Sequence, residues 1–151
     1  MTAIFKRLVI GLVLALTAIL AWNYISVWRP TSKALGDDPR NQFTQVAVYH
    51  QYLVNPSILV FDLRSISDRA SQSDVMRALL QSANALKAKS FDTVILAYKG
   101  NPKFLLKGDY FKKIGNEYEW QNPLHTIQNL PKNTFNLDQS PAFGSWTGGW
   151  L

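Results

Sequence analysis

The chain has 151 residues, a net charge of +6 and no cysteine. This length suits one domain. Setting aside an apolar N-terminal stretch leaves about 120 residues, which is enough for a hydrophobic core without disulfides or a structural metal. The missing cysteine excludes thiolate nucleophiles, CxxC redox pairs, cysteine-ligated zinc, iron–sulfur clusters and a lipidated cysteine.

An uncharged, mostly apolar run occupies residues 8–25 and reads LVIGLVLALTAILAWNYI. At 1.5 Å per residue it spans about 27 Å, which matches the hydrocarbon core of a bilayer. Basic residues precede the run and aromatic residues gather at its far end, as in membrane helices: Lys6, Arg7, Trp22, Tyr24 and Trp28. We therefore predict a cytoplasmic tail and single transmembrane anchor over residues 1–28, in contact with lipid through residues 8–28.

Basic residues flank the run on both sides, so the positive-inside count is nearly balanced. Two acidic residues, Asp37 and Asp38, dilute the second cluster, and a seven-residue tail favours an N-terminus inside. This predicts a cell-membrane protein with an extracytoplasmic domain, which would be periplasmic in a Gram-negative cell. The alternative is a cleaved signal peptide and a secreted domain, although no A-x-A-like site follows the run.

The stretch after the run, residues 29–38, contains Pro30 and Gly36 and predicts a juxtamembrane linker. Residues 39–151 then form the extracytoplasmic domain. Asp38 followed by Pro39 is typical of a helix start. Apolar residues and His50 at three- and four-residue spacing favour a helix from residue 43 to about residue 54, although residues 46–49 would suit a strand equally.

Two apolar runs, ILVFDL at 58–63 and TVILAY at 93–98, predict buried strands. Between them, Ser71 and Asp74 predict the capped start of an amphipathic helix ending near residue 89. Such a unit joins parallel strands by a right-handed crossover. A turn at residues 99–102 then leads into an antiparallel strand at 103–107.

Further on, Asp109 can cap one helical turn that Gly115 ends at its C′ position. The remaining residues are expected to form loops and short strands. The predicted fold class is α+β: one N-terminal transmembrane helix, then a small mixed β-sheet domain packed with two or three helices.

One local string, FDLRS at 61–65, contains an Asp and an Arg at a strand end. It resembles the opening strand of rhodanese domains, whose signature is a similar D-x-R, but the sulfur-carrying cysteine of that family is missing here. The haloacid-dehalogenase pattern also fails, because it needs Asp where Arg64 stands. We interpret Asp62 and Arg64 as a structural pair, and a buried Asp62 requires a nearby cation or backbone donor.

The remaining catalytic candidates are the two histidines, His50 and His125, with Asp62 as a third. Neither histidine lies in an HxxxH or HxH spacing, and no serine lies in a GxSxG elbow, so no metal site and no cofactor are expected. A small envelope hydrolase acting on glycan or phosphoester is the alternative function. It would need a histidine beside a carboxylate in a cleft.

Basic and aromatic residues provide the binding candidates: Lys99, Lys103, Lys107, Lys112, Lys113, Trp120, Trp146 and Trp150. The lysines suit anionic lipid headgroups. From residue 30 onward, 13 Lys and Arg face all 10 acidic residues, a net charge of only +3. Nucleic acid is not expected as a partner. The leading hypothesis is a non-enzymatic, membrane-anchored domain that binds or scaffolds an envelope or membrane protein.

Overall fold

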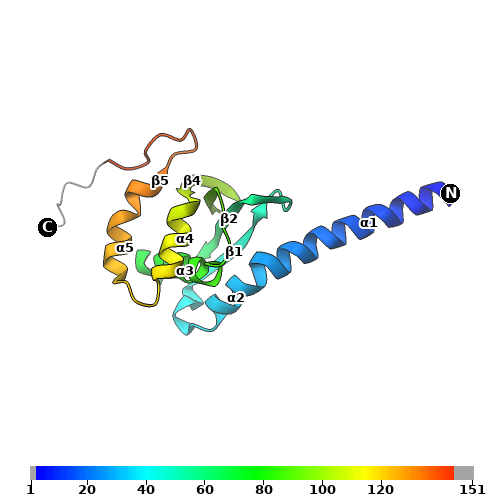
Figure 1. Cartoon of the computed structure of the whole chain (residues 1–151). Helices are drawn as coiled ribbons and strands as arrows, with labels where there is room; N and C mark the ends of the chain where they lie inside the picture. Colours follow the sequence, from blue (N-terminus) through cyan, green and yellow to red (C-terminus); the bar gives the residue numbers. More distant parts are fainter. Residues whose placement is uncertain (1–2, 145–151) are drawn as a thin grey trace.

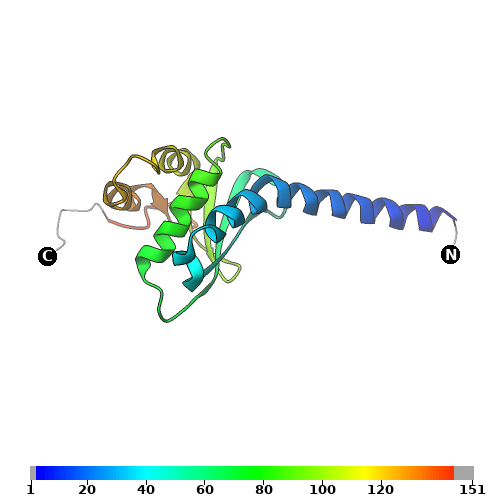
Figure 2. The same ribbon diagram turned by 90° about the horizontal axis from the view of Figure 1, so that it is seen from below.

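One long helix dominates the N-terminal part of the computed structural model, which describes residues 3–144. It runs over Ala3–Gly36 and comprises α1 (Ala3–Asn23), a π-helical turn η1 (Tyr24–Trp28) and α2 (Arg29–Gly36). α1 projects away from the rest of the chain (Figures 1 and 2). The helix is long and apolar enough to cross a membrane, and its apolar window is not buried in protein.

The stretch expected to be a linker is helical over Arg29–Gly36. A proline inside a helix lacks an N–H and meets the carbonyl four residues earlier. Here the wider π turn directly precedes Pro30, and the Arg29 N–H bonds to the carbonyl of Tyr24, five residues back. The helix therefore passes the proline without ending.

One face of this helix packs against the domain through residues spaced four apart. Asn23, Val27 and Thr31 are buried and Leu35 is partly buried. In a regular α-helix each four-residue step drifts by about 40°. The π turn takes up part of that drift and keeps these residues facing the domain.

A five-stranded mixed sheet forms the centre of the domain, in the order β1-β2-β3-β4-β5. The strands are β1 (Thr44–Gln51), β2 (Asn55–Ile66), β3 (Thr93–Tyr98), β4 (Asn101–Lys107) and β5 (Thr134–Phe135). β2 and β3 are parallel, as predicted, and the other pairs are antiparallel. α3 (Gln72–Ala85) connects β2 to β3 and begins with the predicted capping box of Ser71 and Asp74. The α+β prediction is confirmed.

The helix predicted over residues 43–54 is wrong. A short 3-10 helix, η2 (Pro39–Phe43), is followed by β1. The apolar residues of this stretch fit both periods, and pairing with β2 decides in favour of a strand because strand propensity depends on context. β2 begins with Asn55 and Pro56, directly after the hairpin turn.

Helices cover one face of the sheet: the η1–α2 segment, α3 and α4 (Gly108–Glu117) (Figure 2). The main core lies between them and includes Val48, Phe61, Leu106 and Phe111. The opposite face carries a smaller apolar cluster around Val60, Ile95 and Ala97.

The prediction that the helix ends at Gly115 is wrong, because α4 continues to Glu117. A Cβ on Gly115 would lie 2.3 Å from the carbonyl oxygen of Ala83 in α3, so this glycine permits a close helix crossing. The segment expected to form loops and short strands contains β5 and also α5 (Pro123–Asn129) and η3 (Pro131–Asn133). Trp146 and Trp150 lie outside the described residues.

Candidate functional site

A hollow with a volume of about 800 Å³ follows the outer edge of β1. The helix side contributes Trp28, Ser32 and Leu35, and η2 lies at one end. Four consecutive β1 residues, 44 to 47, line the opposite side. Side chains alternate between the faces of a strand, so consecutive residues share a lining only along the strand's edge. We call this hollow the β1 groove.

β1 is the first strand in the sheet order, so its outer edge carries no neighbouring strand. The His50 N–H points away from β2, because it donates to Asn23 Oδ1 at 3.0 Å. By strand alternation, the N–H and C=O groups of Val48 and Val46 point to the same side as those of His50. A strand edge of this kind is a template for one more strand.

The β1–β2 hairpin, whose Leu53 lines the β1 groove, is held against the helix by polar contacts. Asn23 also donates through Nδ2 to the carbonyl of Leu53, and Ser26 Oγ lies 2.8 Å from His50 Nε2. The His50 ring stacks on Trp22 with the ring centroids 4.3 Å apart. These contacts fix the hairpin against the helix.

His50 makes the stability of this junction sensitive to pH. Burial, followed by the positive charge of Lys89, lowers the pKa of His50 below its ordinary value of 6.5. The unfolded chain then binds a proton at a higher pH than the folded chain does. We expect the free energy of unfolding to fall as the pH drops from about 7.5 through 6.5, and to level off below the folded pKa.

This expectation is checked by thermal unfolding of the full chain in detergent across that pH range. His50→Gln keeps a group that can bond to Ser26 but does not titrate, so it should flatten the profile. An unchanged slope in the variant would assign the pH dependence to other groups.

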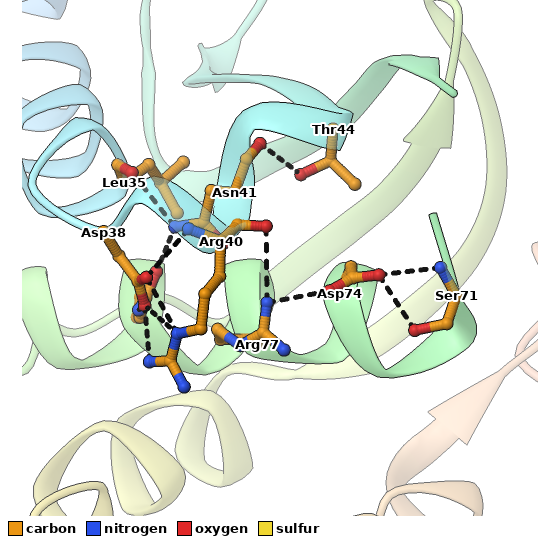
Figure 3. Close-up of polar contacts among 9 residues, drawn as sticks. Leu35, Asp38, Arg40, Asn41, Thr44, Ser71, Asp74 and Arg77 are labelled. Atoms are coloured by element: carbon orange, nitrogen blue, oxygen red, sulfur yellow. Dashed lines mark hydrogen bonds and ion pairs between the residues drawn. The ribbon is translucent and has the colours of Figure 1, made fainter. Parts of the chain in front are cut away.

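The end of the β1 groove at η2 is held by a polar network between η2 and α3 (Figure 3). Asp38 accepts from the backbone N–H of Arg40 at 3.1 Å and pairs with its guanidinium at 2.6 Å. Gln81 of α3 donates to Asp38 at 2.7 Å and accepts from Asn41 at 2.5 Å. Asn41 also donates to the carbonyl of Leu35 at 3.0 Å. Hydrogen bonds, chiefly from the Arg40 side chain, hold the pKa of Asp38 well below its usual range.

The same network reaches the start of α3 (Figure 3). Arg77 pairs with Asp74 at 2.8 Å and donates to the carbonyl of Arg40 at 3.5 Å. Asp74 accepts from the N–H and the hydroxyl of Ser71, which with the Arg77 contact lowers its pKa. η2 is therefore tied to two turns of α3, and this end of the groove is rigidly framed.

Asp62 is completely buried on the sheet face opposite the helices. It accepts from Arg64 Nη1 at 2.6 Å, from the Gly100 N–H at 3.0 Å and from the Tyr49 hydroxyl at 3.2 Å. The cation and the backbone donor that a buried Asp62 requires are thus both present. Burial, and then the Asp62 charge, raise the pKa of Tyr49. These contacts connect two strands to the β3–β4 turn.

The three catalytic candidates do not converge. His50 pairs with Leu59 in the first half of β2, and Asp62 lies in the second half of that strand. His125 is exposed on α5, with its Nε2 atom 3.4 Å from the side chain of Asn129. Within residues 3–144, no group of three His, Asp or Glu residues could hold a metal ion. These contacts place neither histidine beside a carboxylate.

The predicted binding lysines divide between the two ends of the sheet. Lys107 ends β4 beside the start of β3, and Lys112 lies nearby in α4. Lys99 and Lys103 flank the β3–β4 turn at the opposite end. Lys113 is partnered by Glu117 at 3.9 Å. Trp120 is exposed.

The sequence analysis did not predict a site at the β1 groove. The one available signal was Asn23, a polar residue near the end of an apolar run. Its four-residue spacing to Val27 and Thr31 indicates a helix face that continues into the domain.

Comparison of the chain with protein-family models, curated proteins and solved structures finds no match. The β1 groove, the edge of β1 and the apolar helix are therefore the features on which a function can be based.

Proposed function

We propose that this chain is a single-pass, membrane-anchored, non-enzymatic binding domain of the cell envelope. Its β1 groove takes an extended segment of another membrane protein as an additional strand beside β1. The N-terminus lies inside and residues 39–151 lie outside the cytoplasm. The observation that carries the proposal is the groove of about 800 Å³ along the unpaired edge of β1.

Strand addition explains how such a groove would bind. The partner's main chain would pair with the outward groups of Val46 and Val48, and its alternate side chains would contact the groove walls. Trp28, Leu35 and Tyr49 provide apolar contacts on those walls. Main-chain pairing would supply affinity and the wall contacts would supply selectivity.

The charges around the β1 groove point to an uncharged segment. Asp38 is neutralised by Arg40, and Arg64 pairs with Asp62. The other polar residues that line the groove, such as Ser32, are uncharged. A charged partner residue would find no unpaired opposite charge in these two pairs, so apolar and small polar side chains fit best.

The anchor selects the position of the partner. Gly36 lies eleven residues beyond Ile25, so the β1 groove lies within about 16 Å of the end of the apolar run along the helix axis. A chain segment that leaves the same membrane passes through that level. A juxtamembrane segment of another membrane protein meets both requirements.

The proposal is tested by photocrosslinking in intact cells. The natural chain contains no cysteine, so Gln45→Cys offers one attachment point for a thiol-directed photocrosslinker inside the groove. We expect an adduct with a membrane protein. An impermeant maleimide should also label this site once the outer barrier is opened, while the inner membrane stays intact.

Two tryptophan substitutions then separate the groove from the helix surface. Ser32→Trp fills the β1 groove and should abolish the adduct. Lys33→Trp alters the next exposed residue, which does not line the groove, and should leave the adduct unchanged. Loss of the adduct in both variants, or in neither, would contradict binding in this groove.

A further inference from the structure

Three consecutive apolar residues form the tip of the β1–β2 hairpin. Tyr52, Leu53 and Val54 are 80%, 36% and 55% exposed. Single exposed apolar residues are common on protein surfaces, but a contiguous group is typical of a contact surface.

This tip lies beside the apolar helix and not beyond its end. Val54 and Pro56 share a largely apolar cleft with Ala18, Ile19 and Trp22 of α1. Both views show the hairpin alongside the helix, directed back toward its N-terminal half (Figures 1 and 2). The exposed surface of the tip is therefore continuous with that of the helix.

The position along the helix sets the depth of the tip. Ala18 lies about 10 Å and Trp22 about 5 Å before Ile25 along the helix axis. When residues 8–25 fill the hydrocarbon core, a tip beside Ala18 and Trp22 lies at the level of the interface or below it. Asn23 holds it there through the carbonyl of Leu53.

The turn conformation does not account for the residue types at the tip. Tyr52 and Leu53 have φ values of 53° and 64°, in the left-handed region where Gly and Asn are the usual hairpin residues. Bulky side chains are disfavoured there. Bulky apolar residues in a strained turn need a favourable contact that offsets the backbone strain, and water does not provide one for apolar side chains.

Basic residues lie at the same end of the sheet. The loop after α3 contains Lys87 and Lys89 and is joined to the start of β2 by a bond from the Asp92 N–H to the Ser57 carbonyl, 2.8 Å long. Lys112 reaches this loop through Ser90, also at 2.8 Å. Lysines beside an apolar tip suit a bilayer interface with anionic headgroups.

We infer that the hairpin is a second membrane contact. Its tip, residues 52–54, inserts into the domain-side interface of the bilayer that the helix spans, with the loop lysines at headgroup level. Two contacts fix the tilt of the domain relative to the bilayer. The inference rests on the membrane-spanning helix of the proposed function. It needs no partner in the β1 groove, which Leu53 also lines.

The experiment places one cysteine at a time in the full chain, which has none of its own. Leu53→Cys reports the tip, Leu14→Cys reports the middle of the helix, and Asn101→Cys at the β3–β4 turn is the aqueous control. Each variant carries an environment-sensitive fluorophore and is reconstituted in vesicles containing anionic lipid at a high lipid-to-protein ratio. Quenching by iodide and by nitroxide-bearing lipids is then compared, and unchanged thermal unfolding verifies the fold.

We expect the label at position 53 to be quenched by the lipid nitroxides and severalfold less by iodide than the label at position 101. Equal iodide quenching at 53 and 101, with position 14 in lipid, overturns hairpin insertion and leaves the anchor intact. Protection of position 53 from both quenchers also overturns it, because protein then covers the tip. A water-exposed label at position 14 overturns the anchor and the insertion together.

Discussion

Replacing Gly115 with alanine is expected to destabilise the domain by about 3 kcal/mol or more, the upper end for overpacked sites. The added Cβ would lie 2.3 Å from the carbonyl oxygen of Ala83 and 2.6 Å from its carbon, so backbone atoms of α3 would have to move. α3 and α4 both pack into the main core, so their separation would disturb it directly. Chemical denaturation of the full chain in detergent, followed by circular dichroism, measures the change.

Gly36→Ala is the matched control. Gly36 is also helical, but a Cβ there would meet nothing within 4 Å. Gly36 is the last residue of α2, so only part of the preference of about 1 kcal/mol for alanine over glycine in a helix interior applies, and this variant should be unchanged or slightly stabilised. Similar small effects at both positions would show that α3 and α4 are further apart than described.

Asp62→Ala is expected to cost about 3 kcal/mol. It removes the acceptor of the Gly100 N–H and of the Tyr49 hydroxyl, and an unsatisfied buried donor costs about 1–3 kcal/mol. The Arg64 side chain is 52% exposed and regains water, so its ion pair adds little to this cost. The unfolding free energy is measured as for Gly115.

Asp62→Asn separates the contribution of the oxygen that accepts from the Gly100 N–H from that of the oxygen that accepts from Tyr49 and Arg64. The asparagine side chain retains an oxygen for the Gly100 N–H, but its NH2 group replaces the oxygen that accepts from the Tyr49 hydroxyl and from Arg64. We therefore expect a loss of about 1–2 kcal/mol, smaller than that of alanine because the buried backbone donor keeps its acceptor. Asp68→Ala, at an exposed position, should leave stability unchanged. Equal losses for alanine and asparagine would show that the contacts of the second carboxylate oxygen, with Arg64 and Tyr49, and not the bond from the Gly100 N–H, stabilise this part of the sheet.

Local patterns predicted most of the fold. The two continuous apolar runs around residues 60 and 95 have the length of buried strands, and the capping box of Ser71 and Asp74 is a local motif, so these elements could be predicted correctly. Residues 43–54 fit two periods, and only the pairing with β2 distinguishes them. Gly115 was misread because a glycine that permits helix crossing has the same local sequence as one that ends a helix.

The site was less predictable because it depends on distant contacts. The need of a buried Asp62 for a cation or a backbone donor follows from burial alone, and the structure provides both. The β1 groove, however, exists only because the helix around Ser32 lies beside β1. The lysines were grouped because they are close in sequence, but Lys99 and Lys107 lie at opposite ends of a strand.

α1, η1 and α2 form one unbroken helix, so the domain is attached directly to the apolar helix without a flexible linker. Each residue of an α-helix advances the direction of its side chain by about 100°, so one residue inserted within the apolar run would turn the groove by that angle about the helix axis relative to the N-terminal part of the helix. The direction in which the groove faces around the helix axis is thus set by the number of residues in the helix. If two such helices associated side by side, the helix faces in contact would also fix the orientation of the two domains relative to each other.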